Sequence, residues 1–342
     1  MEEAHSLFGG ICETCGYGEP EDFDGASEWD GSIGRLPEES DGYMLIFDAG
    51  EFAAFAVAVN SGNDFAYTTV VLYTDIDLNG HEWAPIGTDQ KKFRGVFEGN
   101  DKTIYNLNVG HPDFSSQGLF GCTQGAEIRN LTVHNALVDG DLNVGTIAGA
   151  PVTTKLSNLT VSGYVRVNGS SYVGGAFGKG ISESVDNITI SVKEGSYVKA
   201  DSVKVENGET INYRTYVGGA IGFMNNGGYV VTNAVSNIDV YGSTTDVGGI
   251  TGMAHYGNSF INCSSSGDIY ITKYAEDGSQ LEIGGIAGVW QNSTESVTFR
   301  NCSFTGTLTA INNEGVKYEG EFENGGLVGR KYGGGKGQLI IE

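Results

Sequence analysis

Val173-Gly-Gly-Ala-Phe-Gly178 is one copy of a six-residue pattern that recurs through most of this chain. The other copies are Val144-Gly-Thr-Ile-Ala-Gly149, Val217-Gly-Gly-Ala-Ile-Gly222, Val247-Gly-Gly-Ile-Thr-Gly252 and Ile283-Gly-Gly-Ile-Ala-Gly288, with shorter relatives at Gly118-Leu-Phe-Gly121 and Gly325-Gly-Leu-Val-Gly329. A period of roughly 20 to 50 residues is typical of a solenoid, in which each unit buries its apolar face against its neighbours. The closing glycines lie 28 to 44 residues apart, which indicates a basic unit of 28 to 30 residues with insertions of variable size.

A second series of motifs runs in step with the glycines, and each member begins with an asparagine. The members are Asn106-Leu-Asn-Val109, Asn130-Leu-Thr-Val133, Asn158-Leu-Thr-Val161, Asn187-Ile-Thr-Ile190, Asn237-Ile-Asp-Val240, Asn262-Cys-Ser-Ser265 and Asn301-Cys-Ser-Phe304. Alternating segments rich in Val, Ile and Thr predict half-buried strands. Each unit has room for three strands and three turns, so we expect an all-β chain in which one unit forms one coil of a parallel β-helix. Equivalent asparagines of stacked coils should then form a hydrogen-bonded ladder, inside the coil or at a corner.

Upstream of the repeats, one segment has a helical pattern. Asp48 followed by Glu51 is a capping box, and Asn60-Ser-Gly62 is a helix-ending signal. Between them, apolar residues at helical spacing are Phe52, Phe55, Ala56 and Val59. This pattern predicts an N-terminal amphipathic capping helix that covers the first coil and prevents pairing at an open sheet edge.

Composition excludes several classes of partner. Acidic residues outnumber basic ones 43 to 19, for a net charge of −24, which argues against nucleic acid and anionic membranes. No run of about 18 apolar residues is present, so we expect no membrane span. The start, Met1-Glu-Glu-Ala-His5, lacks the features of a signal peptide. We expect either a cytoplasmic protein or, in preference, part of a longer polypeptide.

The glycine motifs also resemble a known family. Gly118-Leu-Phe-Gly121 and the Val-Gly-Gly-x-x-Gly series are similar to the GLUG repeat, and the resemblance covers residues 43 to 330. This repeat occurs in surface proteins of gut and oral bacteria and in the region that precedes the catalytic part of some IgA-cleaving metallopeptidases. The segments Glu51-Phe-Ala-Ala-Phe-Ala-Val-Ala-Val-Asn60, Thr74-Asp-Ile-Asp-Leu-Asn79, Trp83-Ala-Pro-Ile-Gly87 and Phe93-Arg-Gly-Val-Phe-Glu-Gly-Asn100 resemble the part that usually precedes such repeats. The resemblance implies a right-handed parallel β-helix at the bacterial cell surface, with no established catalytic activity.

These observations divide the chain into three parts. We expect residues 1–42 to be an acidic linker that packs poorly on the solenoid and carries a small His/Cys/Cys module. Residues 43–69 would form the capping segment, and residues 70–342 the GLUG-type β-helix, continuous from about 70 to 335.

The His/Cys/Cys module contains His5, Cys12 and Cys15. Cys-x2-Cys is the usual spacing of zinc-knuckle ligands, although a closed structural zinc site needs a fourth ligand. The alternatives are a local disulfide or redox-active pair, and a degenerate remnant. Zinc is therefore the candidate cofactor of this module.

A second metal-site candidate is the segment Asp75-Ile-Asp77-Leu-Asn79-Gly80, which matches the first half of a calcium loop. The position of the twelfth-residue glutamate is Ile86. A strand with Ile76 and Leu78 inward and the acids outward explains the same residues.

Three further cysteines have packing as their default interpretation. Cys263 and Cys302 follow equivalent asparagines, so we expect them to stack in neighbouring coils as small apolar residues, with a disulfide allowed but not required. Cys122 follows the first glycine motif alone.

Catalytic signatures are absent from the sequence: it has no Gly-x-Ser-x-Gly, no His-Glu-x-x-His and no phosphate loop. Three functional hypotheses remain. A carbohydrate-binding module predicts outward tyrosines, with candidates Tyr164, Tyr172, Tyr216 and Tyr241, whereas a polysaccharide lyase or glycoside hydrolase predicts a groove with paired carboxylates. A scaffold predicts loops, for which the polar insertions at about 192–215, 268–281 and 309–323 are candidates.

Of these, we expect a non-catalytic extracellular scaffold or adhesin-like module whose loops bind a glycan or a host or matrix protein. The polysaccharide-degrading enzyme and the carbohydrate-binding module are the alternatives.

Overall fold

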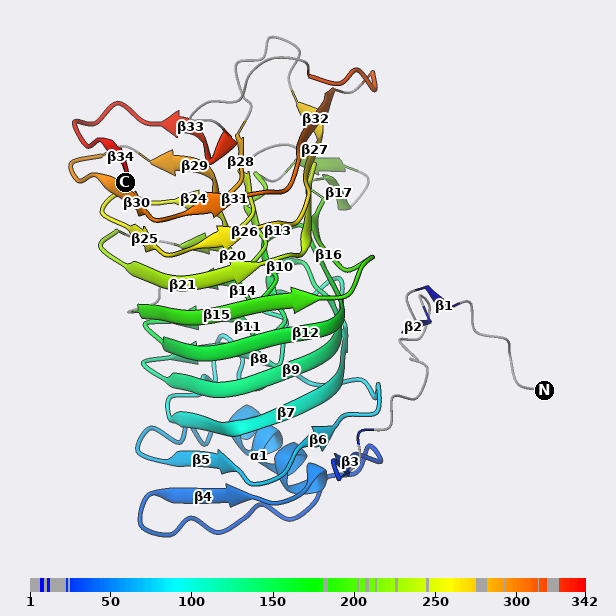
Figure 1. The fold of residues 1–342 in the computed structure, drawn as a ribbon. Helices are drawn as coiled ribbons and strands as arrows, with labels where there is room; N and C mark the ends of the chain where they lie inside the picture. Colours follow the sequence, from blue (N-terminus) through cyan, green and yellow to red (C-terminus); the bar gives the residue numbers. More distant parts are fainter. Residues whose placement is uncertain are drawn as a thin grey trace.

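The computed structural model describes residues 7–8, 11–12, 23, 25–180, 184–201, 203–206, 209–212, 214–224, 227–243, 246–274, 282–291, 293–312, 314–318 and 326–342. These residues form a stack of coils whose strands pair in parallel with the equivalent strands of the next coil (Figure 1). Buried side chains from Trp29 to Val328 make one continuous hydrophobic core. The chain is thus mostly β, with a β-helix-like architecture, as the repeats predict.

Three parallel sheets enclose the core. The wide sheet contains β3 (Ser27–Glu28), β4 (Tyr43–Ile46), β5 (Thr69–Leu72), β6 (Ile76–Asp77), β7 (Val96–Gly110), β9 (Glu127–Asp139), β12 (Lys155–Gly169), β15 (Ser184–Val192), β16 (Tyr197–Ala200), β21 (Val230–Ser236), β22 (Asp239–Gly242), β25 (Ser259–Ile261), β26 (Ser264–Ser265), β27 (Ile269–Tyr274), β30 (Val297–Arg300), β31 (Ser303–Phe304), β32 (Leu308–Asn312) and β34 (Leu339–Ile341). The valine-glycine sheet contains β10 (Leu142–Gly145), β13 (Ser171–Gly174), β19 (Val217–Gly218), β23 (Val247–Gly248) and β28 (Ile283–Gly284). The closing sheet contains β8 (Phe120–Gln124), β11 (Ala148–Val152), β14 (Phe177–Gly180), β20 (Ile221–Met224), β24 (Thr251–Ala254), β29 (Ala287–Gln291) and β33 (Val328–Tyr332).

The glycine motifs stack in register, which confirms the prediction from their spacing. The register of the valine-glycine sheet joins Val144, Val173, Val217, Val247 and Ile283, each followed by its glycine. A Cβ on Gly218 would lie 2.1 Å from the carbonyl oxygen of Ile221. Close approach of two backbone segments, rather than a turn of positive φ, therefore requires glycine at this position.

An asparagine ladder runs along one corner of the wide sheet. Its members are Asn130, Asn158, Asn187, Asn233, Asn262 and Asn301, and each adopts a left-handed backbone with φ between 50° and 55°. The Asn158 amide donates to Asn130 (2.8 Å) and the Asn187 amide donates to Asn158 (2.9 Å). The ladder confirms the prediction of a corner stack.

Two asparagines of the predicted series lie elsewhere. The register of β15 with β21 pairs Ile188 with Ala234, so the equivalent of Asn187 is Asn233 and not Asn237. Asn106 belongs to a second corner, where it accepts from Asn135 (3.2 Å) and donates to Asp77 (2.8 Å).

Helix α1 (Ala49–Ser61) connects β4 to β5, at the position where the sequence pattern predicts a helix. The Asp48 carboxylate accepts from the Glu51 amide (2.8 Å), and the Glu51 carboxylate accepts from the Phe47 amide (2.7 Å). Gly62 ends the helix in a left-handed conformation, with φ of 115°. The four apolar residues of the predicted stripe are buried, and the Phe52 ring stacks on Trp83 with 4.9 Å between centroids.

Residues 25–42 differ from the prediction of a poorly packed linker. Strand β3 pairs in parallel with β6, and Trp29 is buried with its ring edge-to-face against Trp83 at 5.5 Å. Phe23 stacks on Tyr105 with 3.9 Å between centroids. The prediction was based on the acidic composition of residues 1–42. It did not take account of Trp29 and Phe23, the two aromatic residues that attach this part of the chain to the first coils.

The three predicted insertions also differ from simple loops, because each one contains a strand of the wide sheet. These strands are β16, β27 and β32: β16 and β27 both pair with β22, and β32 pairs with β27. Within the first insertion, only β17 (Val203–Glu206) and β18 (Glu209–Asn212) form a separate antiparallel hairpin. No helix among the described residues is long and apolar enough to span a membrane.

Candidate functional site

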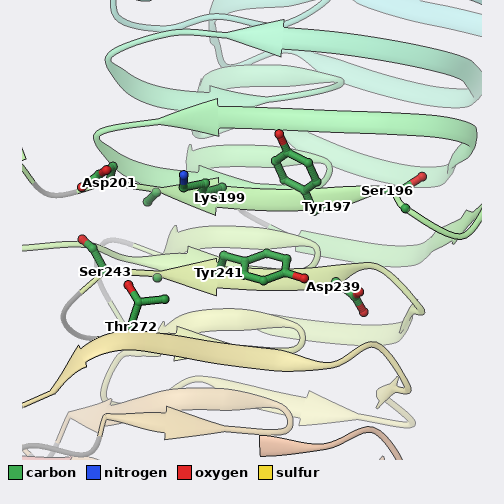
Figure 2. Close-up of a pocket in the computed structure, with 11 residues that line it drawn as sticks. Ser196, Tyr197, Lys199, Asp201, Asp239, Tyr241, Ser243 and Thr272 are labelled. Atoms are coloured by element: carbon green, nitrogen blue, oxygen red, sulfur yellow. The ribbon is translucent and has the colours of Figure 1, made fainter. Parts of the chain in front are cut away.

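A groove of about 470 Å³ lies on the outer face of the wide sheet, across β16, β22 and β27 (Figure 2). Alternation along the strands positions its side chains: Val198 and Val240 point into the core, so their neighbours point outward. The lining residues are Gly195, Ser196, Tyr197, Lys199, Ala200, Asp201, Asp239, Tyr241, Gly242, Ser243 and Thr272. We call this feature the tyrosine groove.

Aromatic rings form the floor of the tyrosine groove. The Tyr241 ring stacks on Tyr270 with 4.6 Å between centroids and an interplanar angle of 5°. Tyr197 meets Tyr241 edge-to-face at 5.9 Å and 84°, and Figure 2 shows the two rings on neighbouring strands in different orientations. The Tyr197 hydroxyl accepts from the Arg166 guanidinium at 2.9 and 3.1 Å, which fixes the ring position.

Two aspartates in register lie beside these rings. The Asp239 carboxylate accepts from the Asp268 amide (2.8 Å), and Asp268 accepts from the amide (2.8 Å) and the hydroxyl (2.7 Å) of Thr307. Burial raises the pKa of Asp239, and the negative charge of Asp268 adds to this. The Thr307 hydroxyl, by its hydrogen bond, lowers the pKa of Asp268. Burial also raises the pKa of Tyr270, to about 12, with the Asp268 charge as the second cause.

The groove therefore combines partly exposed aromatic rings with hydroxyl, ammonium and carboxylate groups. Aromatic rings bind apolar faces of a ligand, and the polar groups around them orient its hydroxyls. Such a site fits a polar ligand with planar apolar patches.

Only part of the predicted tyrosine set lies in this groove. Tyr241 does, but Tyr164 is 1% exposed, so its prediction as an outward residue is wrong. It follows Gly163 at a corner where the register between β9 and β12 shifts, and its side chain is buried there.

Tyr172 and Tyr216 belong to a different surface cluster. Their rings stack at 5.1 Å and 4°, and the Lys179 ammonium lies 4.5 Å from the Tyr172 centroid. Beside them, the Arg214 guanidinium bonds to the carboxylates of Asp246 and Glu282. Burial alone would lower the pKa of Arg214, but the negative charges of Asp246 and Glu282 have the larger effect and raise this pKa overall.

The sequence pattern alone did not indicate Tyr197, Tyr270 or the Asp239–Asp268 pair as site residues. Their signal is the outward position in Tyr197-Val-Lys, Asp239-Val-Tyr and Asp268-Ile-Tyr, which alternate around a buried aliphatic residue. Aligning these segments requires the register across the inserted hairpin, which the sequence pattern does not contain.

The predicted zinc ligands His5 and Cys15 lie outside the described residues. For Cys12 only the backbone is described, in β2 (Ile11–Cys12), which pairs with β1 (Leu7–Phe8). The zinc site therefore stays a prediction. Among the described residues, no cluster of three or more His, Cys, Asp or Glu side chains has the arrangement of a metal site.

The acids of the calcium-loop candidate act as hydrogen-bond acceptors for the next coil. Asp75 accepts from the Thr103 amide (2.7 Å), and Asp77 accepts from the Asn106 side chain (2.8 Å). Ile76 and Leu78 are fully buried. The strand interpretation accounts for this geometry.

Comparison with known proteins gives a likeness in fold and one local match. No family model matches the chain. Over 102 residues, 29% of the chain, it is 39% identical to halomucin from Haloquadratum walsbyi, and the match spans 1% of that protein. The crystal structure described as a "putative immunoglobulin A1 protease" from Bacteroides ovatus has a TM-score of 0.54 and 17% identity, over 88% of this chain and 84% of that one. At this identity the likeness concerns the fold alone.

Proposed function

We propose that the chain is a non-catalytic, glycan-binding module of a bacterial surface protein, with the tyrosine groove as its binding site. The observation that carries the proposal is the groove itself: Tyr197 and Tyr241 line it together with hydroxyl, ammonium and carboxylate groups, and Tyr270 of the next coil stacks on Tyr241. Sugar rings have apolar faces that stack on aromatic rings and equatorial hydroxyls that bond to such groups.

The resemblance of the repeats to GLUG-type surface proteins supports the surface role. A stack of rigid coils would hold the groove at a distance from the cell, as part of a longer extracellular polypeptide. In this proposal the solenoid is right-handed, and α1 closes its N-terminal end by burying Phe52 and Phe55 against the first coils.

A glycan array followed by calorimetry tests the proposal. The unsubstituted chain should bind at least one class of glycan, and Tyr241→Ala should weaken that binding at least tenfold. Tyr67→Ala is the matched control, because Tyr67 is 97% exposed and lies outside the groove. Equal loss in both variants, or binding unaffected by Tyr241→Ala, would overturn the assignment of the site.

A second candidate is a polysaccharide-cleaving enzyme, and the Asp239–Asp268 pair favours it. The raised pKa of Asp239 suits a general acid, while the lowered pKa of Asp268 suits an ionised partner. Against this role, hydrogen bonds from Thr307 already occupy one Asp268 oxygen. Release of reducing ends from a polysaccharide panel, abolished by Asp239→Asn, would establish the enzyme and refute the non-catalytic module.

A further inference from the structure

Two stacked cysteines near the C-terminal end have no part in the proposed glycan site. Cys263 and Cys302 each follow a ladder asparagine and precede serines that pair in register, Ser264 with Ser303. The Ser303 amide donates to the Cys263 carbonyl oxygen (3.0 Å). Equivalent Cα atoms of paired parallel strands lie about 4.8 Å apart. This separation is within the range of about 4.4 to 6.8 Å that disulfides span.

The two thiols differ in their access to solvent. Cys263 is 1% exposed, and its Sγ lies 3.5 Å from the carbonyl oxygen of Ile261. Cys302 is half-buried, and the adjacent strand β31 pairs with β26 alone among the described strands. Cys302 is therefore the more accessible of the two thiols to a small reagent, and Cys263 is almost fully buried.

The pKa values of the two thiols also differ, and the difference again favours Cys302 as the reactive residue. A hydrogen bond from the Cys263 thiol lowers the pKa of Cys302 to about 7, and a second bond from the Cys263 backbone assists. The same side-chain bond, together with burial, raises the pKa of Cys263. Thiolate is the nucleophile in disulfide exchange, and a thiol whose pKa is near the ambient pH attacks best.

We propose that Cys302 and Cys263 form a thiol–disulfide exchange site that accepts a small disulfide and closes into a covalent bond between successive coils. Cys302 is the attacking residue and Cys263 the resolving one. The Cys302 thiolate bonds to one sulfur of the reagent and displaces the other as a thiolate, which takes up a proton. Cys263 then gives its proton to solvent and attacks the Cys302 sulfur, displacing the second small thiol. Two protein thiols are oxidised, and the reagent is reduced to two thiols.

Oxidised glutathione and a Cys12→Ser/Cys15→Ser background test this proposal without interference from the N-terminal cysteines. Two of the three remaining thiols should disappear, and non-reducing peptide mapping should find Cys263 linked to Cys302. Cys122 is the internal control: it is 1% exposed, and burial raises its pKa to about 12, so it should stay reduced. Oxidation of Cys122 at a similar rate, or no loss of thiols, would overturn the proposal.

Two variants separate the steps. Cys263→Ser should trap a stable mixed disulfide at Cys302, formed faster as the pH rises through about 7 because the thiolate fraction increases. Cys302→Ser should leave Cys263 unreacted. A mixed disulfide that persists when both cysteines are present would show that the coils do not close, and it would refute the resolving role of Cys263.

Discussion

The asparagine ladder and the tyrosine groove lie on the same wide sheet but follow opposite rules. At the ladder corner, coil after coil uses asparagine, because the backbone is left-handed there and the side-chain amide donates to the asparagine of the preceding coil, as in Asn158 and Asn187. Along the groove, the residues in register are Arg166, Tyr197, Asp239, Asp268 and Thr307. Residues that repeat from coil to coil are those that the left-handed backbone requires. Outward positions between the corners are under no such restriction and can carry binding groups.

Breaking the ladder should have the largest effect. Asn158→Val places a β-branched residue at φ of 53° and removes the bonds to Asn130 and Asn187, so we expect a loss of about 2–5 kcal/mol in the free energy of unfolding. Asn158→Gly, which tolerates the backbone, should lose about 1–2 kcal/mol. Denaturant unfolding measures both values, and equal losses would contradict the role of the left-handed backbone.

The interaction between Glu98 and Asn130, at the start of the ladder, should stabilise the fold less at acidic pH. Burial alone would raise the pKa of Glu98, but hydrogen bonds from Arg129, Asn130 and the Asn100 amide lower it overall. A lowered carboxyl pKa stabilises the fold above the unfolded-state value of 4.5, and this contribution is lost as the pH falls through the folded-state value.

Glu98→Gln should therefore cost about 1–3 kcal/mol at pH 7, since a charge-assisted bond to Arg129 is lost. The difference between the variant and the unsubstituted chain should shrink below about pH 4.5. Unfolding curves at pH 7 and pH 3.5 provide the comparison, and a constant difference would contradict the assignment to Glu98.

Changes in the groove should affect stability less than changes in the ladder. Tyr241→Ala removes the ring contacts with Tyr270 and Tyr197, and we expect a loss of about 1 kcal/mol. Thermal unfolding of Tyr241→Ala and Asn158→Val under the same conditions compares the two losses of stability directly. A greater loss of stability for Tyr241→Ala than for Asn158→Val would show that the groove residues contribute more to the stability of the fold than the ladder does.

Removing the hairpin should have the smallest effect. Replacing residues 203–212 with a short Gly-Ser linker deletes β17 and β18, which among the described strands pair only with each other, so stability should change by about 0.5 kcal/mol or less. Deletion of 192–215 would also remove β16, which pairs with β12 and β22, and should unfold the neighbouring coils. Similar melting temperatures for the two deletions would contradict the described boundary of the sheet.

Most of the fold could be predicted from the sequence, and little of the site. The helix cap at Asp48 and the glycine stack were predictable because each depends on a local spacing. The packing of residues 25–42 was not, because it depends on a distant contact between Trp29 and Trp83. The zinc prediction for His5, Cys12 and Cys15 remains a prediction.

The sequence by itself determined the coil length, most of the corner asparagines and the glycine column, since close backbone approach and a left-handed backbone restrict the residue type wherever they occur. Only the tertiary structure decided which outward side chains meet. The register pairs Asn187 with Asn233 across an insertion, and brings Tyr197, Tyr241 and Tyr270 to one face. The physical reason is that strand pairing between coils joins residues 26 to 49 positions apart, such as Tyr43 with Thr69 and Ser27 with Ile76, which no local pattern records.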